Sequence, residues 1–295
     1  MATSKTRDPQ KGGPKPPFAE QEQITAPGTE KELTPQADHG EKSYRGSGKL
    51  KDYSILITGA DSGIGRAVAI ACAREGANVS VAYLEEDDDA AETVRWIEQA
   101  DRKAIKVRGD IQDVDFCHSL VQQTYEKFGR LDVLVNNAAY QMAQAELGDF
   151  SVEQIERTFR TNILAMYYLC QAAVPLMKPG ASIINTASIQ AYEPSPELLD
   201  YAATKAAIIN FTKGLSKLVA DQGIRVNAVA PGPVWTPLIP STMPPEKVEQ
   251  FGNNTLFKRP AQPAELAPLY VWLSSPEAAY VTGEVYGATG GRTPF

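Results

Sequence analysis

The feature that most constrains the fold is a glycine-rich turn between a strand-like run and a helix-like run. Residues 53–57 (YSILI) are apolar, residues 58–65 read TGADSGIG, and residues 66–72 (RAVAIAC) have the apolar spacing of a helix. Glycines let the backbone turn sharply and approach a ligand closely, and the free N–H groups of a helix start attract phosphate. The sequence therefore predicts a βαβ unit whose first turn binds a phosphate-bearing ligand.

Strand-like runs alternate with helical patterns from Lys49 onward. The expected strands cover residues 54–58, 79–83, 104–107, 131–135, 182–187, 225–230 and 284–287. Strands that are separated by helices form a parallel sheet through right-handed crossovers, and helices cover both of its faces. We therefore expect an α/β fold, a single doubly wound Rossmann-type domain with a seven-stranded parallel sheet, over residues 49–295.

Two helices and one long connection are expected to build a site near this sheet. Ser151 is a helix cap, with Gln154 three residues later, and the apolar pattern continues until Pro175. A second helix is expected over residues 200–219. Residues 237–260 are rich in proline and loop-like, with a short helical piece at 246–251, and we interpret them as a substrate lid. A rigid surface loop without a binding role is the alternative.

Residues 1–48 have a different composition and are expected to form a flexible or extended N-terminal arm. They contain six prolines, six glycines and 14 charged residues, with few large apolar side chains. Such a segment cannot bury enough apolar surface to fold alone. From Phe18 on, the scattered apolar residues could anchor the arm on the domain or on a neighbouring subunit.

Composition excludes several classes of partner. The net charge of −7 argues against a nucleic-acid partner, and no run of 18 apolar residues is present that could span a membrane. The start of the chain has no apolar segment typical of a secretory signal, so we expect a cytoplasmic protein. Three widely spaced cysteines and two histidines favour buried thiols and leave little for a metal site. We therefore predict no metal.

A proton-transfer group is indicated by Tyr201 and Lys205, which lie four residues apart in an expected helix and so share one face. A free tyrosine has a pKa of about 10, and a neighbouring positive charge favours its phenolate. Ser188 follows a strand-like run 13 residues before Tyr201. A hydroxyl, a phenol and an amine could therefore meet at one mouth of the sheet.

Together these motifs resemble the short-chain dehydrogenase/reductase family. Residues 58–65 match its cofactor loop, residues 136–139 (NNAA) its N-N-A-G segment with Ala139 in place of glycine, and residues 231–236 (PGPVWT) its P-G segment. The resemblance covers residues 49–295. Within the family, the chain is similar to a bacterial subgroup of general-stress and aldehyde-reductase-like oxidoreductases.

The resemblance implies roles for individual residues. Tyr201 would be the general acid or base, Ser188 would orient the substrate oxygen, and Lys205 would lower the pKa of Tyr201 and hold the nicotinamide ribose. Asn162 would hold a water molecule that relays protons to the lysine. The implied cofactor contacts are Gly59, Asp61, Ser62, Gly63, Ile64, Gly65, Tyr83, Leu84, Asp110, Ile111, Asn137, Ala138, Tyr201, Lys205, Pro231, Gly232, Val234 and Thr236.

The choice between NAD and NADP stays open. Glu85, Glu86 and Asp61 place negative charge near the expected ribose 2′ position, which disfavours a 2′-phosphate, whereas the subgroup includes NADP users. We expect an NAD(P)-dependent oxidoreductase that acts on a small alcohol, aldehyde, ketone or polyol, and the resemblance implies a homotetramer. A non-catalytic NAD(P)-binding sensor is the alternative, although a sensor does not need the tyrosine acid.

Overall fold

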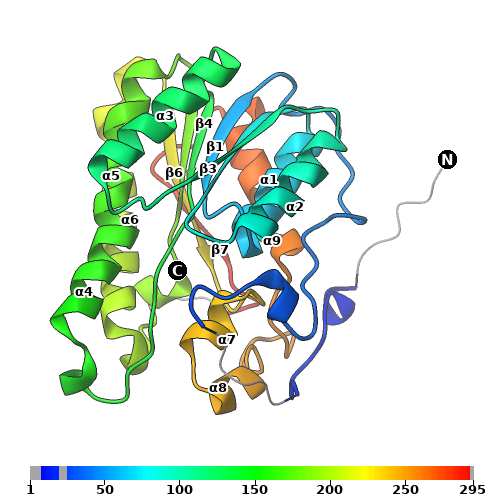
Figure 1. Cartoon of the computed structure of the whole chain (residues 1–295), viewed down its shortest axis with the longest axis vertical. Helices are drawn as coiled ribbons and strands as arrows, with labels where there is room; N and C mark the ends of the chain where they lie inside the picture. Colours follow the sequence, from blue (N-terminus) through cyan, green and yellow to red (C-terminus); the bar gives the residue numbers. More distant parts are fainter. Residues whose placement is uncertain (1–7, 20–24, 293–295) are drawn as a thin grey trace.

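The computed structural model describes residues 8–19 and 25–292, and its centre is one parallel β-sheet (Figure 1). The sheet has seven strands in the order β3-β2-β1-β4-β5-β6-β7, and every pair of neighbours is parallel. The strands are β1 Ser54–Thr58, β2 Asn78–Tyr83, β3 Ala104–Arg108, β4 Val133–Asn136, β5 Ser182–Thr186, β6 Arg225–Pro231 and β7 Val285–Ala288. The predicted single Rossmann-type domain and its seven-stranded sheet are confirmed, with strand ends shifted by one or two residues.

Helices cover both faces of the sheet (Figure 1). One face carries α1 Gly63–Arg74, α2 Asp87–Glu98 and α9 Pro263–Ser274, and the other carries α3 Val114–Phe128, α5 Ala165–Ala173 and α6 Leu199–Leu218. In β1, Ile55 and Ile57 belong to the first apolar layer and Leu56 to the second, as the period of two in a strand requires. Because both faces of a central strand such as β1 are buried, apolar residues follow one another along it, which gives the continuous apolar runs seen in the sequence.

The long helix that was expected from Ser151 to Pro175 is interrupted. Ser151 caps it as predicted, since its hydroxyl oxygen accepts a 3.1 Å hydrogen bond from the N–H of Gln154. After α4 Val152–Phe159 the chain forms a π-helical turn, Arg160–Leu164, before α5 resumes. The buried residues of α4 and the turn are polar, namely Gln154, Thr158 and Asn162, so the apolar pattern of the sequence did not reveal the π-turn.

The predicted lid segment, residues 237–260, contains two short helices, α7 Leu238–Thr242 and α8 Pro245–Glu249. The expectation that residues 237–245 form an irregular loop was wrong for α7. Pro240 lies in its first turn, where the missing N–H has no helical partner to lose, so the proline does not prevent the helix.

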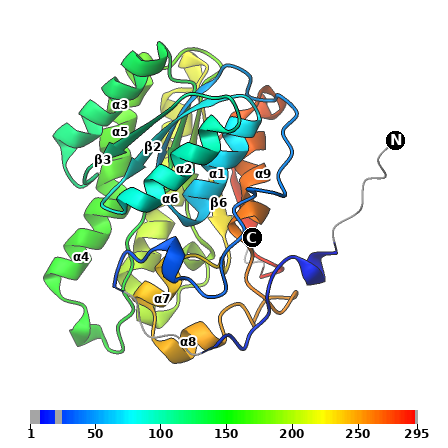
Figure 2. The same cartoon turned by 45° about the vertical axis from the view of Figure 1, so that its right-hand side comes forward.

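The described part of the N-terminal arm lies along the lid and α9 (Figure 2). Phe18 and Leu33 are buried in a cluster with Trp235, Ile239 and Val248. The ring of Phe18 stacks on Trp235 with centroids 4.3 Å apart, and the indole N–H donates to the carbonyl of Pro35 at 2.7 Å. Trp235 is therefore a packing residue beneath the predicted lid segment.

Candidate active site

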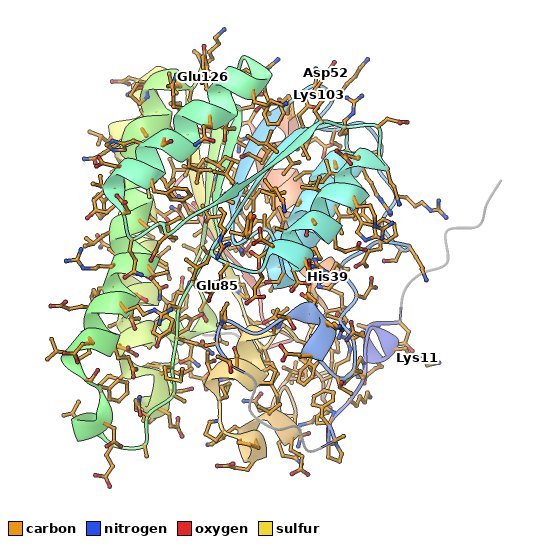
Figure 3. The ribbon with its side chains drawn as sticks, in the orientation of Figure 1. Lys11, His39, Asp52, Glu85, Lys103 and Glu126 are labelled. Atoms are coloured by element: carbon orange, nitrogen blue, oxygen red, sulfur yellow. The ribbon has the colours of Figure 1, made fainter. Side chains whose placement is uncertain are left out.

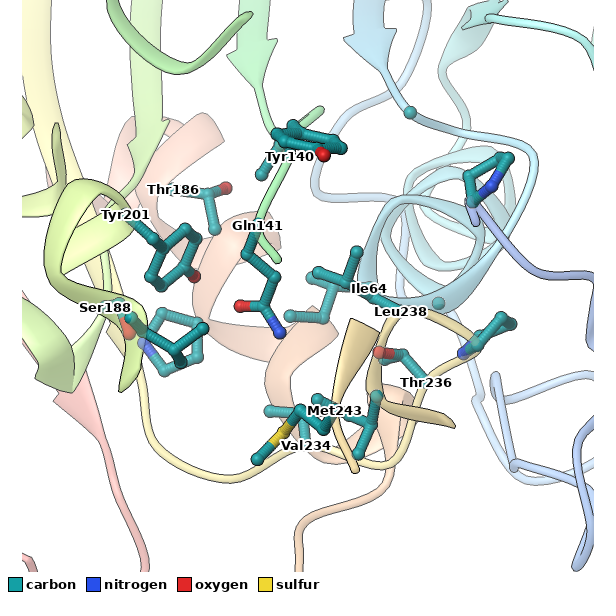
Figure 4. Close-up of a pocket in the computed structure, with 18 of the residues that line it drawn as sticks. Ile64, Tyr140, Gln141, Thr186, Ser188, Tyr201, Val234, Thr236, Leu238 and Met243 are labelled. Carbon is teal, nitrogen blue, oxygen red and sulfur yellow. The ribbon is translucent and has the colours of Figure 1, made fainter. Parts of the chain in front are cut away.

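A cavity of about 700 Å³ opens at the carboxyl ends of the central strands, where the sheet order reverses between β1 and β4. Such a switch point is where open α/β sheets bind ligands, because the two neighbouring connections leave on opposite faces. Figure 4 shows Thr186, Ser188 and Tyr201 on one side of this cavity and Thr236 and Met243 on another.

The glycine-rich turn forms one wall of the cavity. Gly59 has a φ of +62°, a conformation that favours glycine. A Cβ atom on Gly65 would lie 1.9 Å from the carbonyl oxygen of Gly59, so only glycine fits there. Glycine at position 65 therefore lets the start of α1 pack directly against Gly59. A glycine turn at a helix start is the kind of structure that binds the pyrophosphate of a dinucleotide.

The segment after β4 is fastened to this turn. The hydroxyl oxygen of Thr58 accepts from the backbone N–H groups of Asn137 and Ala138 at 3.0 and 3.1 Å. The side-chain amide of Asn137 donates to the carbonyls of Thr58 and Gly59, both at 3.1 Å. The turn and the end of β4 therefore hold one fixed geometry.

The cavity continues past the ends of β2 and β3. Its lining there includes the predicted residues Asp61, Ser62, Tyr83, Leu84, Asp110 and Ile111. Burial raises the pKa of Asp61 to about 6, and the nearby charge of Asp89 acts in the same direction, against hydrogen bonds that lower it. Glu85 and Glu86 also line this end, so its charge is negative near neutral pH.

Three predicted residues meet at the other end of the cavity. Ser188 and Tyr201 face one another across the end of β5 and the start of α6, and both line the cavity (Figure 4). The ammonium nitrogen of Lys205 donates to the carbonyl of Thr186 at 2.8 Å and lies 5.1 Å from the ring centre of Tyr201. Pro231, Gly232, Val234 and Thr236 line the adjoining wall.

Burial dominates the proton affinities of these groups. It raises the pKa of Tyr201 to about 12, although a hydrogen bond with Ser188 acts to lower it. Burial also lowers the pKa of Lys205 to about 7. The pKa of Tyr201 is thus set mainly by burial, and a lowering of this pKa by Lys205 stays a prediction.

Asn162 lies in the π-turn and is fully buried. Its side-chain oxygen accepts from the N–H of Tyr140 at 2.8 Å, and its amide donates to the Tyr140 carbonyl at 2.9 Å and to the Thr204 hydroxyl at 3.0 Å. The side chain therefore braces the segment after β4 against α6, and its role in a proton relay stays a prediction.

Several cavity residues were missed by the sequence reasoning. The carbonyl oxygen of Thr186 accepts the hydrogen bond from Lys205, and the Thr186 hydroxyl lies 2.9 Å from the hydroxyl of Tyr270. Gln141 donates to the Thr242 hydroxyl at 2.9 Å and so connects the cavity floor to α7. Pro27 brings the N-terminal arm to the cavity rim. Only Thr186 had a usable signal, its position two residues before Ser188.

The structure also bears on metal binding and on membrane insertion. Within residues 8–19 and 25–292, no cluster of three or more His, Cys, Asp or Glu side chains is arranged to hold a metal ion. In the same ranges, no helix is long and apolar enough to cross a bilayer.

Sequence comparison agrees with the motifs. The sequence model of the family described as Enoyl-(Acyl carrier protein) reductase matches residues 59–293. The chain belongs to the short-chain dehydrogenase/reductase family. It is 52% identical to the Uncharacterized oxidoreductase YghA of Escherichia coli over 277 residues, covering 93% of this chain and 94% of that protein. It is 44% identical to the Glucose and ribitol dehydrogenase of Daucus carota over 286 residues, covering 95% and 97%.

Solved structures support the same assignment. A short-chain dehydrogenase from Burkholderia cenocepacia in complex with NADP superposes with a TM-score of 0.77 at 31% identity, covering 82% of this chain and 98% of that one. The protein is thus an oxidoreductase of this NAD(P)-dependent family, with the fold that the family uses to bind a dinucleotide.

Proposed function

We propose that this protein transfers a hydride between NAD or NADP and a small alcohol or carbonyl compound, with Tyr201 as the general acid or base. The observation that carries the proposal is the meeting of Ser188, Tyr201 and Lys205 at one end of a cavity whose other end is the glycine-rich turn. A bound nicotinamide would supply or accept the hydride. The catalytic fragment would be residues 49–295, with residues 1–48 as an appended arm.

The chemistry that we assign to the side chains is proton transfer and charge stabilisation. Hydride addition to a carbonyl leaves negative charge on its oxygen, so Tyr201 would donate a proton to that oxygen while the Ser188 hydroxyl orients it. In the oxidation direction Tyr201 would remove the alcohol proton. Lys205 would hold the nicotinamide ribose and restore the proton on Tyr201 through a water molecule near Asn162.

The cofactor contacts that we propose are those expected from the family motifs. They comprise the glycine turn, the ends of β2 and β3, the segment after β4 and the β6 loop: Gly59, Asp61, Ser62, Gly63, Ile64, Gly65, Tyr83, Leu84, Asp110, Ile111, Asn137, Ala138, Pro231, Gly232, Val234 and Thr236. All of these residues line the cavity except Gly65, whose lack of a side chain shapes the turn.

The substrate end of the cavity favours small hydroxylated compounds. Its lining includes the polar side chains of Gln141, Gln190 and Ser195, and the ion pair of Glu197 with Lys247 at 3.2 Å connects this wall to α8 of the lid. One relative is a glucose and ribitol dehydrogenase, and another is the NADPH-dependent aldehyde reductase 1 of Arabidopsis thaliana. An absorbance screen of polyols, sugars, aldehydes and ketones with each cofactor tests the proposal, and no turnover with any pair would contradict it.

Cofactor preference should respond to the acidic residues at the β2 end. Replacing Asp61 or Glu85 with Arg should raise the NADP-to-NAD ratio of kcat/KM by about tenfold or more, because a 2′-phosphate would then meet a positive charge. Assays at pH 8 keep Asp61 ionised in the parent protein, since its pKa is about 6. Exposed Glu98 at the end of α2, changed to Arg, is the control. A ratio that stays constant would place these carboxylates away from the ribose.

We also propose a homotetramer in the cytoplasm. Two observations support assembly. The first is that β7 is an edge strand of the sheet, and the second is that α4, the π-turn and α5 carry exposed apolar side chains, namely Val152, Ile155, Phe159, Leu164 and Tyr167. The three cysteines are free and buried, which is usual in a reducing compartment. The last strand and the tail, residues 290–295, would lie at a subunit contact, and residues 293–295 of that tail lie outside the described residues.

Light scattering on the full chain should give the mass of four copies, about 128 kDa from a 32.0 kDa chain (4 × 32.0). Phe159→Glu should lower that mass, because a charge would replace an exposed apolar side chain in the proposed contact. A monomeric parent protein would contradict the tetramer.

A further inference from the structure

The N-terminal arm reaches the back of the glycine-rich turn through one carboxylate. Glu30 lies in a short 3₁₀ turn, Glu30–Glu32, and is only 4% exposed. Its Oε1 atom accepts a 2.6 Å hydrogen bond from the backbone N–H of Gly63, which is the first residue of α1. Glu30 is not among the residues that line the cavity, so it contacts the turn on the side that faces away from the cavity.

The Glu30 carboxylate caps the start of α1, where the residues next to the helix provide no side-chain cap. Ser62 is the N-cap residue of α1, but its side chain makes no capping hydrogen bond there. The first N–H groups of a helix have no partner within the helix, and a buried one needs an acceptor. Gly63 has a φ of +49°, and glycine gives this position little conformational restraint of its own. Glu30 therefore supplies the missing restraint from 33 residues upstream.

Glu30 is itself held from two sides. His39 is buried (labelled in Figure 3), with its Nε2 2.8 Å from Glu30 Oε1 and its Nδ1 3.0 Å from Glu41 Oε1. Burial alone would lower the pKa of His39, but the hydrogen bonds to Glu30 and Glu41 raise it to about 9, so it carries a positive charge at neutral pH. The pKa of Glu30 is lowered by the same partner against its burial.

The second support comes from α2. The backbone N–H of Glu30 donates to Asp89 Oδ2 at 2.9 Å, and Asp89 Oδ1 accepts from Arg66 at the same distance. The Arg66 Nε donates to the carbonyl of Asp61 at 2.8 Å. The arm, α2 and both ends of the Asp61–Gly63 segment thus form one hydrogen-bonded network.

We propose that Glu30 is a positioning residue of the dinucleotide site, which acts through Gly63 to hold the glycine-rich turn in the shape that receives the pyrophosphate. A rigid receiving turn loses less conformational freedom on binding, so the dinucleotide binds more tightly. The hydrogen bond from His39 fixes the Glu30 side chain so that its Oε1 atom stays aimed at the Gly63 N–H. The inference rests on dinucleotide binding but on no particular substrate.

The test is calorimetric titration of the full-length protein with NAD, NADP and ADP-ribose. Glu30→Ala should weaken all three by about tenfold, whereas Glu30→Gln, which keeps an acceptor oxygen for Gly63, should stay within about threefold of the parent. Glu32→Gln is the matched control, because it removes the same charge from an exposed position of the same turn. With a substrate in hand, the KM for the cofactor should rise while kcat at saturation is kept.

Each result separates positioning from other roles. His39→Gln is a second route to the same defect, and titrations at 25 °C on variants whose melting temperature lies well above 25 °C exclude unfolding. An unchanged dissociation constant in folded Glu30→Ala overturns the proposal. Tighter NADP binding in that variant, with NAD unchanged, also overturns it, because the carboxylate would then act as a charge barrier. A parent protein that binds none of the three ligands instead contradicts the proposed function.

Discussion

Replacing Tyr201 with Phe should lower kcat by about two to four orders of magnitude, the usual contribution of general acid or base catalysis. The change removes one oxygen atom and leaves the ring, so the cavity keeps its shape and the dissociation constant of the cofactor should change by less than about threefold. Steady-state kinetics and a dinucleotide titration measure the two effects. Tyr125→Phe, a half-buried tyrosine of α3 that does not line the cavity, is the control.

The pH dependence gives a second check on Tyr201. Burial raises its pKa to about 12, so the phenolate that alcohol oxidation needs is scarce at neutral pH. The oxidation rate of the parent protein should therefore rise as the pH increases from 7 to 10, and Tyr201→Phe should abolish this rise. Near-parental turnover in the variant would remove Tyr201 from the mechanism.

The sheet could be predicted because its determinants are local. Each central strand is a short apolar run between turn residues, as in residues 54–58, and its burial on both faces leaves no polar alternation to misread. The π-turn around Asn162 and the helix α7 were not predicted. In both places the local pattern allows more than one backbone path, and contacts with distant residues such as Tyr140 decide between them.

The candidate site divides in the same way. The glycine turn and the Tyr201–Lys205 pair are short motifs whose spacing is fixed by one turn and one helix, so the sequence displays them directly. Glu30 and Gln141 act through partners 33 and 101 residues away, Gly63 and Thr242, and no spacing in the sequence reveals such contacts. The Tyr201 pKa also depends on burial, which appears only once the surrounding helices are packed.

Replacing Lys205 with Met should remove most turnover and also weaken cofactor binding by at least tenfold, because the amine is proposed both to hold the nicotinamide ribose and to restore the proton on Tyr201 through a water molecule. Methionine fills a similar volume, so the loss would report chemistry more than packing. Lys213→Met, an exposed lysine on the same helix, is the control. An unchanged cofactor dissociation constant would show that the ribose contact is wrong.

The same variant should not melt at a lower temperature. Burial lowers the pKa of Lys205 from 10.5 to about 7, which means that the unfolded chain binds the Lys205 proton more tightly than the folded protein does. Burial of Lys205 therefore lowers the free energy of unfolding at pH 7. This loss of stability decreases as the pH rises from 7 and is gone above 10.5, and methionine removes it at every pH. The Tm at pH 7 should stay equal or rise, despite the lost hydrogen bond to the Thr186 carbonyl. A large fall in Tm would mean that Lys205 stabilises the folded protein. A stable but inactive variant would mean that the buried amine is needed for catalysis and destabilises the fold.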